Sequence, residues 1–160
     1  MSKLIIMSGP AGSGKSTWAN LYAFNNPNTL VLSTDELRLE LFHTQYPDGK
    51  SEKIIRNTII QRAIDASKQN VNVIVDSAVV KNKSILKWYR QLHQYFSETE
   101  LVIIDTPLEI CLKQNQMRDR HVPEYVIEQM FSFKEPLNKE IIDSFNNITI
   151  INSVEHKEEK

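Results

Sequence analysis

Cysteine, long apolar runs and strong net charge are all scarce in this 160-residue sequence, and each scarcity excludes a class of protein. The single cysteine, Cys111, excludes an internal disulfide framework and a structural cysteine–zinc site, and its apolar neighbours indicate a core position. No apolar stretch approaches the roughly 20 residues that span a bilayer, and the N-terminus lacks the pattern of a signal peptide. We therefore expect a soluble cytoplasmic protein with no membrane partner.

The length and the charge of the chain set two further bounds. The formal net charge of −1 argues against a protein whose whole surface binds nucleic acid, and leaves only a local basic patch for that purpose. The length suits one domain with a single core. We expect this domain to cover residues 1–152 and a charged C-terminal tail to cover residues 153–160.

Five short apolar runs, continuous rather than alternating, predict parallel strands that are buried on both faces. They cover residues 4–7, 29–33, 71–77, 101–106 and 148–152. The helical segments between them cover residues 15–24, 35–42, 52–69, 84–96, 108–117 and 123–133. This alternation indicates an α/β fold with a doubly wound, five-stranded parallel sheet, in which ligands bind beyond the carboxyl ends of the strands.

The stretch GPAGSGKST, residues 9–17, directly follows the first run and holds three of the four glycines. Its pattern, G-x-x-x-x-G-K-[ST], is typical of a P-loop, whose backbone N–H groups wrap a phosphate chain. We expect Lys15 to reach the β- and γ-phosphates of a nucleotide and the Ser16 hydroxyl to ligate Mg²⁺. The expected nucleotide-binding residues of this loop are Gly9, Ala11, Gly12, Ser13, Gly14, Lys15, Ser16 and Thr17.

The second predicted strand is followed by STDELR. Ser33 and Glu36 form a plausible capping box, which explains both residues without any function. Asp35 is either a first-turn carboxylate that suits the helix dipole or a base that accepts a proton from an attacking hydroxyl. Arg38 lies three residues on, on the same helix face, where a guanidinium can hold an anionic acceptor.

Carboxylates also follow the third and fourth predicted strands. Asp76 ends the run NVIVD, where an acidic residue is the usual second metal anchor of P-loop enzymes or, alternatively, caps the next turn. The adjacent Ser77 is a candidate for the acceptor site. Asp105 precedes TPLE, a strong helix start with Thr106 as N-cap, so we assign Asp105 to structure.

A polar connector, MRDRH, lies between the last two predicted helices. Arginines on such a connector can lie over the phosphates of a bound nucleotide and neutralise the charge that develops during phosphoryl transfer. A solvated charged turn without any function has the same composition. The spacing does not separate Arg118 from Arg120 as the residue that contacts the donor.

Together, GPAGSGKSTWA, STDELR, VIVDS and RDRHVPEYVI resemble the kinase domain of phage-type polynucleotide 5′-hydroxyl kinases, from the first strand to about Pro136. The likeness includes Trp18 directly after the P-loop. It implies a P-loop kinase fold, in which Asp35 is the general base on the acceptor hydroxyl and Arg38 binds the acceptor's phosphate. It also implies that a lid arginine, best matched by Arg118, contacts the donor phosphates.

The chain departs from that family in two respects. We expect no C-terminal phosphatase domain like that of the bifunctional phage enzymes, because 160 residues are too few to hold both domains. Its lid segment has Gln114, Gln116 and Met117 where lysine or arginine is expected. Proteins with the same core phosphorylate nucleosides, sugars, antibiotics and adenylylsulfate.

Basic and aromatic residues alternate after the third predicted strand, a combination that can bind a single strand by charge and base stacking. An amphipathic helix whose Trp88 packs inward explains the same pattern. The residues are Lys81, Lys83, Lys87, Trp88, Tyr89 and Arg90.

We therefore predict an ATP-dependent kinase that requires Mg²⁺ and acts on the 5′-hydroxyl end of DNA or RNA. Small hydroxyl acceptors are the first alternative. The second alternative is an ATPase or a nucleotide-dependent switch. Such a protein needs a residue that orients the attacking water, and no glutamine or glutamate directly follows Asp76. Neither the preferred nucleic acid nor the oligomeric state follows from the sequence. The expected catalytic residues are Lys15, Asp35, Arg38 and Arg118, the metal ligands Ser16 and Asp76, and the acceptor-binding residues Asp35, Arg38, Asp76 and Ser77.

Overall fold

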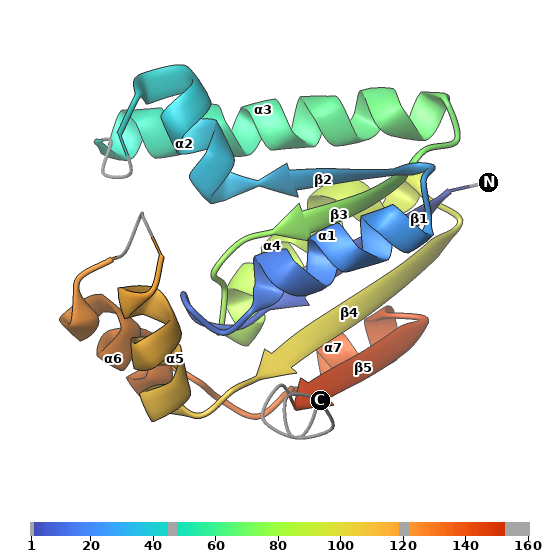
Figure 1. The fold of residues 1–160 in the computed structure, drawn as a ribbon. Helices are drawn as coiled ribbons and strands as arrows, with labels where there is room; N and C mark the ends of the chain where they lie inside the picture. Colours follow the sequence, from blue (N-terminus) through green and yellow to red (C-terminus); the bar gives the residue numbers. More distant parts are fainter. Residues whose placement is uncertain (1, 45–47, 119–121, 153–160) are drawn as a thin grey trace.

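A parallel sheet forms the centre of the protein (Figure 1), seen in a computed structural model that describes residues 2–44, 48–118 and 122–152. The five strands of this sheet run in the order β2-β3-β1-β4-β5, and every neighbouring pair is parallel. The strands are β1 (Lys3–Ser8), β2 (Thr29–Ser33), β3 (Asn72–Asp76), β4 (Glu98–Asp105) and β5 (Asn147–Asn152). This topology confirms the predicted α/β fold with a doubly wound parallel sheet.

Helices cover both faces of the sheet, with α1 on one face and α3, α4 and α7 on the other (Figure 1). The central strand β1 shows why both faces need cover, because Leu4 and Ile6 pack toward α3 and α4 while Ile5 and Met7 pack toward Ala19 of α1. The helices are α1 (Lys15–Asn25), α2 (Thr34–Phe42), α3 (Gly49–Lys68), α4 (Asn82–Leu92), α5 (Leu108–Gln116), α6 (Glu124–Ser132) and α7 (Lys139–Ser144).

The strand register aligns the ends of β2 and β3, because Ser33 stands opposite Asp76. The Ser33 side chain accepts a hydrogen bond from the backbone N–H of Glu36 at 3.3 Å, so α2 starts directly at this edge. This cap is half of the predicted capping box. It places Asp35 in the first turn of α2, close to the end of β3.

Several elements differ from the prediction, among them α3, which begins at Gly49 rather than at residue 52. Strand β4 begins at Glu98, earlier than the apolar run at residues 101–106, because Thr99 and Glu100 are buried against neighbouring strands. The predicted helix at residues 84–96 ends as an α-helix at Leu92 and continues as a 3₁₀ turn, His93–Tyr95. Helix α7 was not predicted.

Thr106 does not cap α5, contrary to the prediction. Pro107 occupies the N-cap position, and the Thr106 hydroxyl instead donates to the backbone carbonyl of Ser13 at 2.8 Å. The hydroxyl therefore ties the start of α5 to the P-loop. Cys111, one turn into α5, is fully buried as expected, and burial raises the pKa of its thiol to about 11.

Within the described ranges, no helix combines the length and the hydropathy that crossing a membrane requires. The predicted C-terminal tail at residues 153–160 lies outside the described residues.

Candidate functional site

The loop between β1 and α1 has a backbone that glycine alone tolerates at two positions. Gly12 has a φ of 80°, and a Cβ there would approach the carbonyl oxygen of Cys111 to 2.5 Å. Gly14, with a φ of 104°, is the N-cap of α1 and offers no side chain to the first N–H groups of the helix. Those N–H groups and the positive end of the helix dipole therefore face any anion that binds in the loop.

Lys15 lies inside this loop rather than on the surface. Its side chain is buried, and Nζ donates to the backbone carbonyl of Pro10 at 2.9 Å. Burial lowers the pKa of Lys15, and the negative charges of Asp76 and Asp35 counteract part of that effect. A phosphate in the loop would supply the negative charge that this buried ammonium group lacks.

The Ser16 hydroxyl and the Asp76 carboxylate form an oxygen pair at the start of α1 and the end of β3. Ser16 Oγ donates to Asp76 Oδ2 at 2.7 Å, and Asp76 is buried. Oxygen ligands of this kind suit Mg²⁺, which keeps several waters and commonly takes only one or two ligands from the protein. No cluster of three or more His, Cys, Asp or Glu residues exists in the described part of the chain, so the other ligands would be water and phosphate oxygens.

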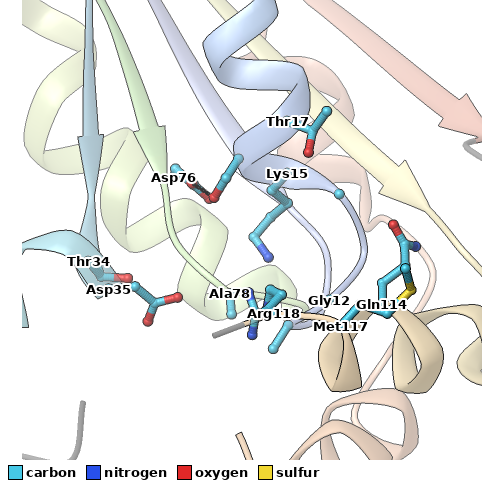
Figure 2. Close-up of a pocket in the computed structure, with 13 residues that line it drawn as sticks. Gly12, Lys15, Thr17, Thr34, Asp35, Asp76, Ala78, Gln114, Met117 and Arg118 are labelled. Carbon is cyan, nitrogen blue, oxygen red and sulfur yellow. Dashed lines mark hydrogen bonds between the residues drawn. The ribbon is translucent and has the colours of Figure 1, made fainter. Parts of the chain in front are cut away.

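The P-loop and these two residues line a pocket of about 270 Å³. Figure 2 shows the side chains of Lys15, Asp35, Asp76 and Arg118 around this pocket, contributed by α1, α2, β3 and the segment after α5. The described residues that line it are Ala11, Gly12, Gly14, Lys15, Ser16, Thr17, Thr34, Asp35, Asp76, Ala78, Gln114, Met117 and Arg118.

Asp35 and Arg38 are joined by an ion pair in which Arg38 Nη1 lies 2.6 Å from Asp35 Oδ1. Arg38 is also held from α3, because Glu52 accepts from its Nε at 2.7 Å and from its Nη2 at 3.2 Å. Burial lowers the pKa of Arg38, but the hydrogen bonds and charge of Glu52, with those of Asp35, outweigh it and raise the pKa above its usual value. The guanidinium is therefore a fixed cation beside the pocket.

Glu52 is a site residue that the sequence analysis missed. It lies 14 residues from Arg38, on a different helix, and no local spacing connects the two. Only the packing of α2 against α3 brings them together.

Arg118 reaches the pocket from the segment after α5. Its Nη2 donates to Asn115 Oδ1 at 3.2 Å, while its buried Nε has no hydrogen-bond partner among the described residues. A buried N–H without a partner is costly, and a donor phosphate would satisfy it. Arg120, the other candidate for the lid arginine, lies outside the described residues.

Four predicted residues that the structure describes do not line this pocket, and one of them, Arg38, lines the hollow next to it. Gly9 donates its backbone N–H to Val79 O at 3.1 Å, and Ser13 is fully buried behind the loop. Ser77 lines a neighbouring hollow of about 600 Å³ instead. Thr34 lines both spaces, so the pocket and the hollow adjoin at the start of α2.

Asp105 lies apart from the pocket, as the assignment to structure predicted. Its exposed carboxylate is 3.4 Å from Lys134 Nζ. The inward packing of Trp88 is also seen, because its side chain is only 2% exposed. Arg90 is exposed and pairs with Glu140.

Known proteins with this architecture include kinases of several acceptors. An L-seryl-tRNA(Sec) kinase from Methanococcus maripaludis is 26% identical over 134 residues, which are 80% of this chain and 51% of that protein. A chain of the Pnkp1/Rnl/Hen1 RNA repair complex matches with a TM-score of 0.74 at 24% identity, over 82% of this chain and 43% of that chain. A sugar kinase from Janibacter matches with a TM-score of 0.66 at 14% identity, over 95% and 86% of the two chains.

The two solved structures are similar in fold at these identities, and the chain spans about half the length of the curated relative. A protein family described as an AAA domain matches residues 4–137. This match runs from β1 to the segment beyond α6 and covers most of the chain. The chain therefore belongs to this AAA-domain family.

Proposed function

We propose that this protein transfers the γ-phosphoryl group of ATP to the 5′-hydroxyl end of DNA or RNA, as the phage-type polynucleotide kinases do. One observation carries the proposal: Asp35 lines the P-loop pocket and is paired with Arg38, which lines the adjoining hollow. A carboxylate that faces the donor, beside a cation that faces the acceptor, suits transfer to a hydroxyl next to a phosphate.

In the proposed reaction, the oxygen of the acceptor hydroxyl attacks the γ-phosphorus and forms the new P–O bond. The bond from that phosphorus to the β–γ bridging oxygen breaks, ADP leaves, and the hydroxyl proton passes to the Asp35 carboxylate. Lys15 and Arg118 stabilise the charge on the phosphoryl oxygens. Bound Mg²⁺, held by Ser16 and Asp76, would neutralise phosphate charge.

Two features support a nucleic-acid acceptor. The hollow beside Arg38 has a volume of about 600 Å³, more than twice that of the P-loop pocket, so it has room for a nucleotide unit. The L-seryl-tRNA(Sec) kinase acts, by its name, on an RNA that carries a serine. The ATPase alternative gains no support from the two residues after Asp76, because Ser77 lines the neighbouring hollow and Ala78 has no group that orients water.

The test is an acceptor panel. The protein is incubated with [γ-³²P]ATP, Mg²⁺ and, in separate reactions, 5′-hydroxyl oligodeoxynucleotides, 5′-hydroxyl oligoribonucleotides, nucleosides and sugars. We expect label on the oligonucleotides. Label on a nucleoside or a sugar alone would support a small-molecule kinase, and inorganic phosphate that no acceptor diverts would support an ATPase.

A further inference from the structure

The hollow beside Arg38 carries basic side chains that the transfer step does not use. It lies between α2, α3 and α4. We propose that Arg56 and Lys87 form a second anion subsite in this hollow, which binds the next phosphate of the acceptor beyond the one at Arg38. The proposal rests on the proposed nucleic-acid acceptor and says which part of it the hollow binds.

Arg56 is held in place by two side chains of α4. Its guanidinium lies 4.1 Å from the centre of the Trp88 ring, and Trp88 is itself buried. Its Nε and Nη2 both donate to Gln91 Oε1, at 3.0 Å and 2.5 Å. A guanidinium has five N–H donors, so the edge formed by Nη1 and the second N–H of Nη2 is left for a ligand. That edge suits the bidentate binding of a phosphate.

Arg56 also lacks an acidic partner. Arg38, Arg62 and Arg90 each form an ion pair, with Glu52, Glu40 and Glu140 respectively. No carboxylate lies within ion-pair distance of Arg56 in residues 2–44, 48–118 and 122–152. Burial lowers its pKa, and no acidic neighbour offsets that effect. An anion would supply the missing counter-charge.

The rest of the hollow has the same sign of charge. Lys53 and Lys87 line it from α3 and α4, and neither forms an ion pair within the described part of the chain. Ser84, one turn before Lys87, adds a hydroxyl donor on the same helix face. Glu52, which Arg38 already binds, is the one acidic residue among the described residues of this lining. In a chain of formal net charge −1, this is a local basic patch.

A nucleic-acid strand carries a phosphate at every nucleotide. A strand that places its first phosphate at Arg38 presents the next one to the same hollow, where Arg56 has a free edge. A nucleoside 3′-monophosphate has only the first of these phosphates. The subsite therefore favours acceptors of at least two nucleotides.

The kinetic test compares a nucleoside 3′-monophosphate with a dinucleotide that also ends in a 3′-phosphate. For the wild type, we expect a lower KM for the dinucleotide. In Arg56→Gln this preference should shrink by about tenfold, the value of one charge-assisted hydrogen bond. Arg62→Gln is the matched control on the same helix, because Arg62 pairs with Glu40 and does not line the hollow, and it should keep the preference. An Arg56→Gln enzyme with the wild-type preference would overturn the proposal.

A binding measurement separates the subsite from the proposed function. With the P-loop saturated by AMP-PNP and Mg²⁺, inorganic phosphate should shift the NMR resonance of the Trp88 indole in the wild type and not in Arg56→Gln. The second tryptophan, Trp18, is removed as Trp18→Phe to assign the signal. If phosphate shifts the Trp88 resonance but the protein phosphorylates no oligonucleotide, the subsite is supported and the proposed function is contradicted. If phosphate leaves Trp88 unshifted, the subsite is overturned.

Discussion

The Arg38 guanidinium has three of its five N–H donors occupied, two by Glu52 and one by Asp35. The two that remain are fixed in direction, because carboxylates on α2 and α3 hold the group from two sides. An acceptor phosphate that binds them is placed next to Asp35. This geometry supports the proposal that the P-loop pocket binds the phosphate donor and that the hollow beside Arg38 binds the acceptor.

The first prediction at this scale concerns the proposed base. Asp35→Asn removes the proton acceptor but keeps the size and the hydrogen-bonding oxygen of the side chain. We expect kcat to fall by about 100- to 10,000-fold, the usual contribution of a general base. The affinity for ATP, measured by calorimetry, should be unchanged because the P-loop is intact.

Glu36→Gln is the control for that substitution, because Glu36 is the exposed neighbour of Asp35 and does not line the pocket. It should keep the wild-type kcat. Wild-type transfer by Asp35→Asn would remove Asp35 from the mechanism.

A second prediction at this scale concerns Glu52, which positions Arg38 without reaching the P-loop pocket. Glu52→Gln removes the charge that fixes the guanidinium. We expect kcat/KM for the acceptor to fall by roughly tenfold, equivalent to about 1.4 kcal/mol, while KM for ATP stays the same. Steady-state kinetics with each substrate varied in turn measures this split.

Glu40→Gln is the matched control for Glu52→Gln. It breaks another ion pair between α2 and α3, Arg62–Glu40, outside the hollow. An equal loss in both variants would mean that Glu52 acts only through helix packing.

At the scale of elements, the strands were predictable because each apolar run is continuous, and β1, β3 and β4 are buried as expected. The prediction of burial on both faces was wrong for the edge strand β5, where Ile150 is 63% exposed. The P-loop was predictable because its glycines, lysine and serine have a local spacing. Helix α7 was not, since Ile141 is its one buried residue and leaves no periodic pattern. The contact of Glu52 with Arg38 and the bond from Thr106 to the P-loop both depend on tertiary packing, which local sequence does not encode.

The prediction for the elements concerns Asn82, the buried first residue of α4. Its Nδ2 donates to Pro136 O at 2.9 Å, and its Oδ1 accepts from the backbone N–H of Asn138 at 3.1 Å. These bonds tie α4 to the segment that leads into α7. Asn82→Ala leaves both partners unsatisfied, so we expect the free energy of unfolding to fall by about 1–3 kcal/mol, measured by urea denaturation.

Lys83→Ala is the control for the Asn82 substitution, because Lys83 is the exposed next residue of the same helix. Its unfolding midpoint should match the wild type. An unchanged midpoint for Asn82→Ala would show that the two bonds do not hold the segment.

At the scale of the whole molecule, two spaces meet at the carboxyl ends of the strands. The P-loop pocket lies after β1, the hollow beside Arg38 lies between α2, α3 and α4, and Thr34 lines both. In doubly wound sheets, ligands bind at the carboxyl ends of the strands. The sequence analysis predicted a site at this edge from the order of strands and helices. The identity of the acceptor depends on side chains from three separate helices, and therefore needs an experiment.

The most direct measurement is the position of the label after transfer. A 5′-hydroxyl oligonucleotide is incubated with the protein, [γ-³²P]ATP and Mg²⁺, and is then digested to 5′-mononucleotides. We predict that the label is found only in the nucleotide from the 5′ end, and that Asp35→Asn gives none. Label that is absent from the oligonucleotide, or located elsewhere in it, would contradict the proposed 5′-hydroxyl kinase.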